Sequence, residues 1–408
     1  GVFKGVRELK PAHGGFFSEN GFAASAYWRL EAKAHTESFE ETLAHVKNLV
    51  LDAIRRQSGA PVCSMLSGGL DSSVIAAVSG VKETFSVDYE ENELFFKATA
   101  FQPDSDKKYI DAMTAFLGGK HTNIVLGTDD LVESLFLAVH ARDLPGMADV
   151  DGSMLLFCRA IRADYAAALS GECADELFGG YPWYRDEKIR ETDGFPWSQS
   201  TAYRASFLKD GALGAIDPVK YVYEKYSETV RGSAVLPGES ALEKRMKEMY
   251  QLNLHWFMQT LIDRGDRMSG VSGLEIRMPF CDRRIAEYAY NIPWAFKNYK
   301  GREKGLLREA KKGMLPEEVL WRKKSPYPKT HHPKYLKKVS EILSDILSTP
   351  TAPLHQLIKK EALAALLPAE NAAPGTQPWY GQLMTAPQTI AYFIQLNEWL
   401  SHYKVSVI

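Results

Sequence analysis

The chain has 408 residues, of which 45% are hydrophobic and 25% charged, and its formal net charge at pH 7 is -2. A chain of this length can bury a large core without disulfides or metals, and the usual size of domains divides it into about two or three units. Its near-zero net charge excludes a global electrostatic attraction to nucleic acid or to an anionic membrane, so any argument from charge has to be local.

The first elements of the chain are predicted to be short strands followed by a long helix. Residues 2–30 alternate apolar and polar side chains between turn sequences, a pattern typical of short strands. Ser38 and Glu41 form a capping box, and the apolar residues after it recur at helical spacing. We therefore expect an amphipathic helix within 37–57.

Strands and helices alternate over the next part of the chain. Predicted strands cover 61–66, 84–89, 121–127 and 165–169, with helical patterns between them. This alternation is typical of an α/β fold with a doubly wound parallel sheet, in which ligands bind beyond the carboxyl ends of the strands.

Helical patterns dominate from about residue 215 onward. We therefore expect an α/β core over about 31–215 and a mostly helical part over about 216–408 that packs on the sheet. Within the helical part, LPAENAAPGTQPW (366–378) is rich in proline, alanine and glycine, which is typical of a linker or a mobile loop.

The cysteines are far apart in the sequence, and none belongs to a CxxC pair. This spacing argues against a disulfide framework and a zinc site, and it indicates reduced thiols in a cytosol. No apolar stretch approaches the roughly 20 residues that cross a bilayer, and no signal-peptide pattern is present. We therefore expect a cytoplasmic protein. The cysteines are Cys63, Cys158, Cys173 and Cys281.

The string LSGGLDSS (66–73) follows a predicted strand and precedes a predicted helix. A glycine pair there lets backbone N–H groups approach a ligand, and the helix adds its positive end. Anionic phosphate suits this loop, and Asp71 beside it calls for a cation such as Mg²⁺. Because the chain lacks the lysine of a GxxxxGK[ST] loop, the site suits a departing pyrophosphate. A serine-rich turn that only caps a helix is the structural alternative.

SGGLDSS resembles the pyrophosphate-binding loop of the ATP-pyrophosphatase superfamily. Three later strings resemble the synthetase domain of glutamine-dependent asparagine synthetases: LSGECADELFGGY (169–181), DRMSGVSGLEIRMPFCDRR (266–284) and GREKGLLREAKKGMLPEEVLWRKK (301–324). These blocks keep the family's order, whereas the first block alone is shared with other amidating and RNA-modifying enzymes. The opening segment is similar to the closing strands of the family's glutaminase domain.

This resemblance implies a fold of the adenine-nucleotide α-hydrolase (ATP-pyrophosphatase) type for residues 31–408, with residues 1–30 as terminal strands of a glutaminase domain that is otherwise missing. It implies that ATP and Mg²⁺ are used to convert aspartate into asparagine through β-aspartyl-AMP, with release of AMP and pyrophosphate. The nitrogen donor is ammonia, or glutamine through the missing domain. The first cysteine, Cys63, lies well inside the chain, so we expect this polypeptide not to hydrolyse glutamine.

The resemblance also assigns roles to residues. Asp71 and Asp175 are expected to bind Mg²⁺ through hard oxygen ligands. Glu172 is expected to face the acyl-adenylate as the base for ammonium, and Lys324 to stabilise charge on the α-phosphate. Contacts with ATP or pyrophosphate are expected from Leu66, Ser67, Gly68, Gly69, Asp71, Ser72, Ser73, Val87, Ser170, Gly171 and Lys304.

Several of these residues have structural alternatives. Glu172 could serve only to interact with the dipole of the helix that follows it. Lys304 could form a surface ion pair with a residue four positions away. Glu275 and Arg277 point the same way in a predicted extended segment. They could form a structural ion pair, support the site, or make a partial contact with the amino-acid substrate. Cys173 stands where the family usually has glycine, and we interpret it as a small apolar substitute rather than a nucleophile.

Other functions stay open at this point. The basic run 321–338 has seven Lys or Arg and no acid, which fits a solvated surface, an RNA-binding strip or a local phosphate contact. A lactam-forming synthetase, a synthetase for another carboxylate and an RNA-modifying ATP pyrophosphatase are alternatives. Retention of Glu172 favours asparagine synthetase, and we expect neither nucleic acid nor membrane as a partner. A homodimer remains open.

Overall fold

The computed structural model describes residues 2–59, 61–96, 104–368, 378–379 and 385–407. Most of the segment predicted to be a linker or mobile loop therefore lies outside the described residues. The strands are β1 (His13–Ser18), β2 (Gly21–Ala26), β3 (Cys63–Met65), β4 (Glu83–Tyr89), β5 (Lys120–Leu126), β6 (Ala167–Leu169) and β7 (Glu275–Arg277).

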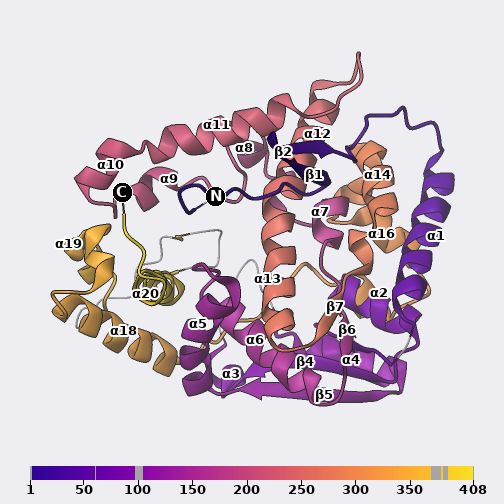
Figure 1. The fold of residues 1–408 in the computed structure, drawn as a ribbon. Helices are drawn as coiled ribbons and strands as arrows, with labels where there is room; N and C mark the ends of the chain where they lie inside the picture. Colours follow the sequence, from indigo (N-terminus) through magenta and orange to yellow (C-terminus); the bar gives the residue numbers. More distant parts are fainter. Residues whose placement is uncertain (1, 60, 97–103, 369–377, 380–384, 408) are drawn as a thin grey trace.

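Helices cover both faces of the larger sheet and form most of the second half of the chain (Figure 1). In the first half they are α1 (Phe39–Gln57), α2 (Leu70–Ser79), α3 (Asn92–Phe95), α4 (Lys107–Leu117), α5 (Thr128–Arg142), α6 (Asp149–Arg162), α7 (Ala174–Phe178), α8 (Glu187–Arg190) and α9 (Thr201–Ala205). In the second half they are α10 (Asp210–Ala215), α11 (Pro218–Arg231), α12 (Ala241–Leu252), α13 (Gln259–Val271), α14 (Arg283–Asn291), α15 (Trp294–Lys297), α16 (Gly305–Ala310), α17 (Glu317–Leu320), α18 (Pro333–Ser348), α19 (Lys360–Ala364) and α20 (Ala386–His402).

The larger sheet has the strand order β5-β4-β3-β6-β7, and all its neighbouring strands run parallel. The chain builds outward from β3 to β5 and then returns to add β6 and β7 on the other side. This order is doubly wound, and its reversal point lies between β3 and β6. The predicted parallel sheet is confirmed, and its reversal point is where a crevice for a ligand is expected.

The position of strand β7 differs from the expected division of the chain into an α/β core and a helical part. It pairs with β6 in register Ala168↔Ile276, so the sheet takes an edge strand from the part predicted to be helical. A strand of only three residues is too short to show a period in the sequence. The α/β core and the helical part are therefore interleaved along the chain.

Both faces of the central strands are buried. Leu169 in β6 belongs to one apolar cluster with residues of α1 and α2, including Val50 and Ile75. Met65 in β3 belongs to another, with Leu155 of α6. Strands buried on both faces carry nearly continuous apolar sequences, as the predicted segments do. The capping box also forms, with Ser38 N–H donating to Glu41 at 2.8 Å and starting α1 as predicted.

Strands β1 and β2 form an antiparallel hairpin separate from the larger sheet, in the register Phe17↔Phe22. The expectation of short strands within the first 30 residues is confirmed for this hairpin. Its aromatic side chains Phe16, Phe17 and Phe22 are 73%, 80% and 60% exposed. Over the described part of the chain, no helix has both the length and the apolar character needed to cross a membrane.

Candidate active site

The glycine-containing loop between β3 and α2 is held tightly against α4. Gly68 has φ +66°, and a Cβ there would lie 2.7 Å from Tyr109 Cβ and 2.8 Å from Ile110 N. Only glycine fits this position, because both its backbone conformation and its surroundings exclude a side chain. Gly69 then precedes the first turn of α2, so the loop presents the N-terminus of a helix at the end of β3.

The serine hydroxyls organise this loop from within. Ser67 N–H donates to Ser72 Oγ at 3.2 Å, and the two hydroxyl oxygens are 3.1 Å apart. Ser73 is fully buried, and its hydroxyl has no hydrogen-bond partner among the described residues. Leu66 is 2% exposed and Val87 is half-buried in β4, so both also serve as core residues.

The loop after β6 packs directly on the first loop. Ser170 N–H donates to Arg277 O at 2.8 Å, which continues the ladder between β6 and β7. A Cβ on Gly171 would lie 2.7 Å from the backbone nitrogen of Ser72, so the two loops approach as closely as their backbones allow. The structure thus brings together the two strand-end loops that the sequence placed at one edge of the sheet.

Two lysines and two aspartates form a buried group beside these loops. Lys304 Nζ lies 2.6 Å from Asp71 Oδ2 and 2.6 Å from Asp175 Oδ1. Lys324 Nζ lies 2.8 Å from Asp175 Oδ2. Lys304 is only 2% exposed, so the surface pairing considered for it is wrong. Its ammonium group is held between the two carboxylates.

The surroundings shift the pKa values of Asp71 and Asp175 in opposite directions. Burial raises the pKa of Asp71, although Lys304 partly opposes that effect. Burial also acts to raise the pKa of Asp175, but Lys304 and Lys324 together lower it below its usual range. For Lys324, burial acts to lower the pKa, and Asp175 outweighs it and raises the pKa. Asp175 and Lys324 are therefore a charged pair at neutral pH.

The two carboxylates also suit a divalent cation. Asp71 Oδ1 is buried without a hydrogen-bond partner in the described structure, and Lys304 already bridges the two side chains. Magnesium binds proteins through one or two carboxylates and completes its shell with water and substrate phosphates. Asp71 and Asp175 could hold such an ion beside a bound nucleotide.

Glu172 forms an ion pair with Arg264 of α13. The Arg264 side chain is 4% exposed, and its guanidinium lies 5.5 Å from the ring centre of Tyr327. Glu172 Oε2 has no hydrogen-bond partner among the described residues. Arg264 therefore orients Glu172 through one carboxylate oxygen, while the other oxygen is buried without a hydrogen bond from any described residue. Arg264 was not found from the sequence because it lies 92 positions away and just before a recognised block.

The basic run does not act as one unit. Arg322 donates to Ser67 O at 2.8 Å, forms an ion pair with Asp106 and lies 4.2 Å from the ring centre of Tyr109. Lys334 lies farther along the chain and pairs with Asp129, which is 60% exposed. The run thus supplies internal supports to the first loop and a solvated surface elsewhere. Arg322 lies within the block 301–324, but no role was predicted for it from the sequence.

Glu275 and Arg277 lie on the edge strand β7 and pair with each other at 2.9 Å. Arg277 also donates to the backbone oxygens of Gln57 and Gly59, each at 2.9 Å, and so ties the end of α1 to the sheet. The Arg277 side chain is thus held by Glu275 and by the residues at the end of α1, which favours the structural ion pair over contact with the substrate.

The expectation of reduced thiols is wrong for two of the four cysteines. Cys173 and Cys281 form a disulfide, with their Cα atoms 5.7 Å apart. The cysteines are separated by 108 positions, so their pairing depends on how α7 packs near Phe280 and could not be read from spacing. Cys173 has φ +79°, the left-handed conformation that favours glycine. Cys173 therefore has a backbone conformation suited to the glycine that the resemblance leads us to expect there.

We expect two thiols per chain to react with a thiol reagent in denaturant without reductant, and four after reduction, because Cys63 and Cys158 are the free pair. The substitution Cys281→Ser should give three reactive thiols before reduction, since it releases Cys173. Four reactive thiols in the unreduced protein would contradict the pairing, and mass spectrometry of the cross-linked peptide would confirm it.

The parallel sheet, with a glycine loop and a buried acid pair at its reversal point, has the architecture of an α/β enzyme. The family model described as asparagine synthase matches residues 45–401. The chain therefore belongs to the asparagine synthase family, which confirms the prediction made from its motifs.

Similar proteins agree with this membership. "Asparagine synthetase [glutamine-hydrolyzing] 3" of Bacillus subtilis is 46% identical, and the alignment covers 100% of this chain and 68% of that relative. "Asparagine synthetase [glutamine-hydrolyzing] 1" of the same organism is 28% identical over 74% of this chain and 52% of its own length. "Amidase chry2" of Gibberella zeae is 26% identical over 84% of this chain and 62% of its own length.

Proposed function

We propose that this chain forms asparagine from aspartate in an ATP-dependent reaction, through a β-aspartyl-AMP intermediate. Membership of the asparagine synthase family and the 46% identical relative support this activity. The observation that carries the mechanism is the buried group of Asp71, Asp175, Lys304 and Lys324 beside the Gly68 turn. It places cations and carboxylates where two loops meet at the reversal point of the sheet.

In the first step, an oxygen of the aspartate side-chain carboxylate attacks the α-phosphorus of ATP. The bond from that phosphorus to the bridging oxygen breaks, and pyrophosphate leaves. The loop after β3 holds the departing pyrophosphate through its N–H groups and the Ser67 and Ser72 hydroxyls. Lys304 and Lys324 balance the charge that develops on the phosphates. These roles fit a nucleotide-binding fold of the ATP-pyrophosphatase type.

Magnesium is proposed to bind to Asp71 and Asp175 together with the nucleotide phosphates. When bound, it neutralises phosphate charge and orients the triphosphate. The two lysines pair with these carboxylates, so they lie close enough to contact the phosphates of a nucleotide bound there.

In the second step, ammonia attacks the activated carbonyl carbon and AMP leaves. Ammonia is mostly ammonium at neutral pH, so a proton has to be accepted before or during attack. Glu172 is proposed as that base. Arg264 acts as a positioning residue, because it holds one Glu172 oxygen and leaves the other without a partner.

We expect Glu172→Gln to retain exchange of labelled pyrophosphate into ATP within a few-fold, while asparagine formation falls by about 10²–10⁴-fold. The amide keeps the shape of the side chain but cannot accept the proton in the second step. Glu248→Gln is the matched control, because Glu248 pairs with Arg245 at 3.1 Å and is similarly buried outside the site. Equal losses of exchange and synthesis in Glu172→Gln would assign Glu172 to nucleotide binding instead.

Free ammonia is the proposed nitrogen donor for this chain. Cys63, the first cysteine, is buried in β3, and burial raises the pKa of its thiol to about 12, so it cannot act as the glutaminase nucleophile. We propose that the β1–β2 hairpin belongs to a glutaminase unit, which its exposed phenylalanines support. Glutamine hydrolysis by this purified chain would refute the first of these proposals.

A different acceptor carboxylate is the second candidate, favoured by similarity to proteins named as amidases. Screening the twenty amino acids for pyrophosphate release in the presence of ammonia separates the two. Release that depends on aspartate supports asparagine formation, whereas release with another acid and not with aspartate overturns it. RNA modification is disfavoured, because the basic run is divided between an internal support and a surface ion pair.

A further inference from the structure

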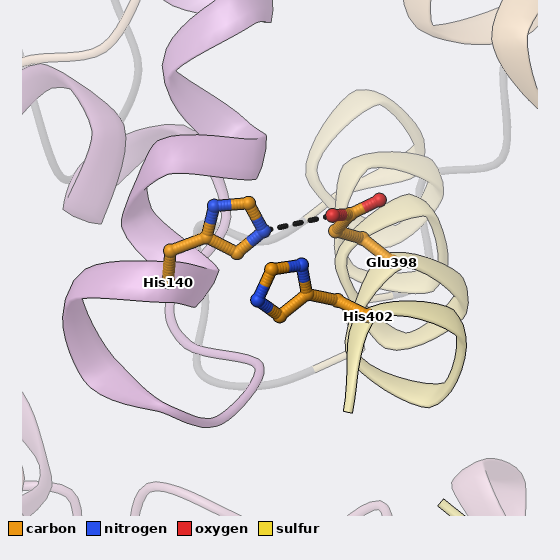
Figure 2. A group of neighbouring side chains, drawn as sticks. All are labelled: His140, Glu398 and His402. Carbon is orange, nitrogen blue, oxygen red and sulfur yellow. Dashed lines mark hydrogen bonds and ion pairs between the residues drawn. The ribbon is translucent and has the colours of Figure 1, made fainter. Parts of the chain in front are cut away.

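A cluster of metal-binding side chains lies where α5 and α20 end together, and it shares no residue with the proposed active site. His140 comes from the last turn of α5, and Glu398 and His402 come from the end of α20. Figure 2 shows the three side chains pointing toward one another. One ligand atom from each lies within 4.8 Å of the others.

The contacts within this cluster already resemble a partly assembled site. His140 Nε2 and Glu398 Oε1 are 2.8 Å apart, as the dashed line in Figure 2 marks. The rings of His140 and His402 stack with centroids 4.1 Å apart. Glu398 and His402 are four residues apart, which places them on one face of α20. The three side chains are therefore brought together by helix geometry and not by a flexible loop.

Buried packing holds the two helices in this arrangement. Val139 of α5 and Trp399 of α20 are direct chain neighbours of the cluster and belong to one apolar core. Gln395 donates to Leu135 O at 3.1 Å, and Trp399 Nε1 donates to Asp143 O at 2.9 Å. A site on helices fixed by such packing needs only rotation of side chains to close around an ion.

We propose that His140, Glu398 and His402 bind a divalent transition metal, with Zn²⁺ as the best match. Two imidazoles and one carboxylate are a usual zinc donor set, and a water molecule would fill the fourth position. The ion would replace the hydrogen bond between His140 and Glu398. The His140 and Glu398 side chains are 37% and 24% exposed, so zinc can reach them from solvent. Bound zinc would fasten the C-terminal helix to α5.

Titration of the chelator-treated, full-length chain with Zn²⁺ tests this proposal, with millimolar Mg²⁺ present to compete at the acid pair. Wild type is expected to bind one zinc ion at this site. His140→Ala and His402→Ala should each weaken zinc binding by about tenfold or more. Removing a residue that only hydrogen-bonds to a metal ligand already weakens metal binding by about tenfold, and removing a ligand itself should weaken it at least as much. Zinc should raise the Tm of wild type and not that of the double variant.

His45→Ala is the matched control. His45 also pairs with a carboxylate, Glu37, at 3.0 Å, and its ring centre lies 4.0 Å from that of Tyr288. Within the described part of the chain, however, no third metal-binding side chain completes a cluster with them. This variant should bind zinc as wild type does. Glu398→Gln provides a further test that keeps the shape of the cluster, and circular dichroism without zinc checks that every variant folds.

Two results would overturn the proposal. Absence of zinc binding by wild type would show that the cluster is only a hydrogen-bonded pair with a stacked ring. Zinc binding of unchanged strength in the folded His140→Ala/His402→Ala variant would place the ion elsewhere in the chain. Anomalous scattering at the zinc edge, with a peak among the three side chains, would support it directly.

Discussion

Replacing Asp175 by asparagine is expected to lower aspartate-dependent exchange of labelled pyrophosphate into ATP by at least about 100-fold. Asp175 pairs with both Lys304 and Lys324 and is the proposed partner of Asp71 at the metal. A neutral amide leaves the buried Lys304 and the half-buried Lys324 with Asp71 alone. We therefore also expect the free energy of unfolding to fall by about 3–5 kcal/mol, measured by urea denaturation.

Asp129→Asn is the control for this substitution. Asp129 also pairs with two lysines, Lys334 at 2.9 Å and Lys338 at 2.5 Å, but it is exposed. Exposed ion pairs contribute little to stability, so exchange and unfolding should both stay close to wild type. If Asp175→Asn kept wild-type exchange under the same conditions, the buried group would not be part of the adenylation site.

Replacing Gly171 by alanine is expected to damage the site without removing any functional group. The added Cβ would lie 2.7 Å from Ser72 N and 3.0 Å from the carbonyl carbon of Asp71. These are backbone atoms, so the two loops must separate. A displacement of about 1 Å can cost about 100-fold in rate, and overpacking costs about 1–3 kcal/mol of stability. Steady-state asparagine synthesis and urea denaturation measure the two effects.

Gly270→Ala serves as the comparison. Gly270 lies in α13, is exposed, and has no atom within 4 Å of a Cβ placed on it. Alanine there should leave synthesis unchanged and raise helix stability by about 0.5–1 kcal/mol. Wild-type synthesis and stability in Gly171→Ala would show that the loops can move apart without loss, which contradicts the close approach as a requirement.

The sequence by itself determined the local elements and the family. The Ser38 capping box, the alternation of apolar strands with helices and the positive φ of Gly68 depend on neighbours within a few residues. The spacing of apolar residues and the residue types found in turns follow from such short-range geometry, so both can be recognised in the sequence. The family followed from four ordered strings, and the asparagine synthase match confirms it.

Only the tertiary structure decided which distant side chains meet. Lys304 lies 233 positions from Asp71, and Arg264 lies 92 positions from Glu172. The Cys173–Cys281 disulfide was predicted against, and β7 was not recognised as part of the sheet. No local pattern encodes such pairings, because they arise when the apolar faces of separate elements pack together and carry their polar residues into contact.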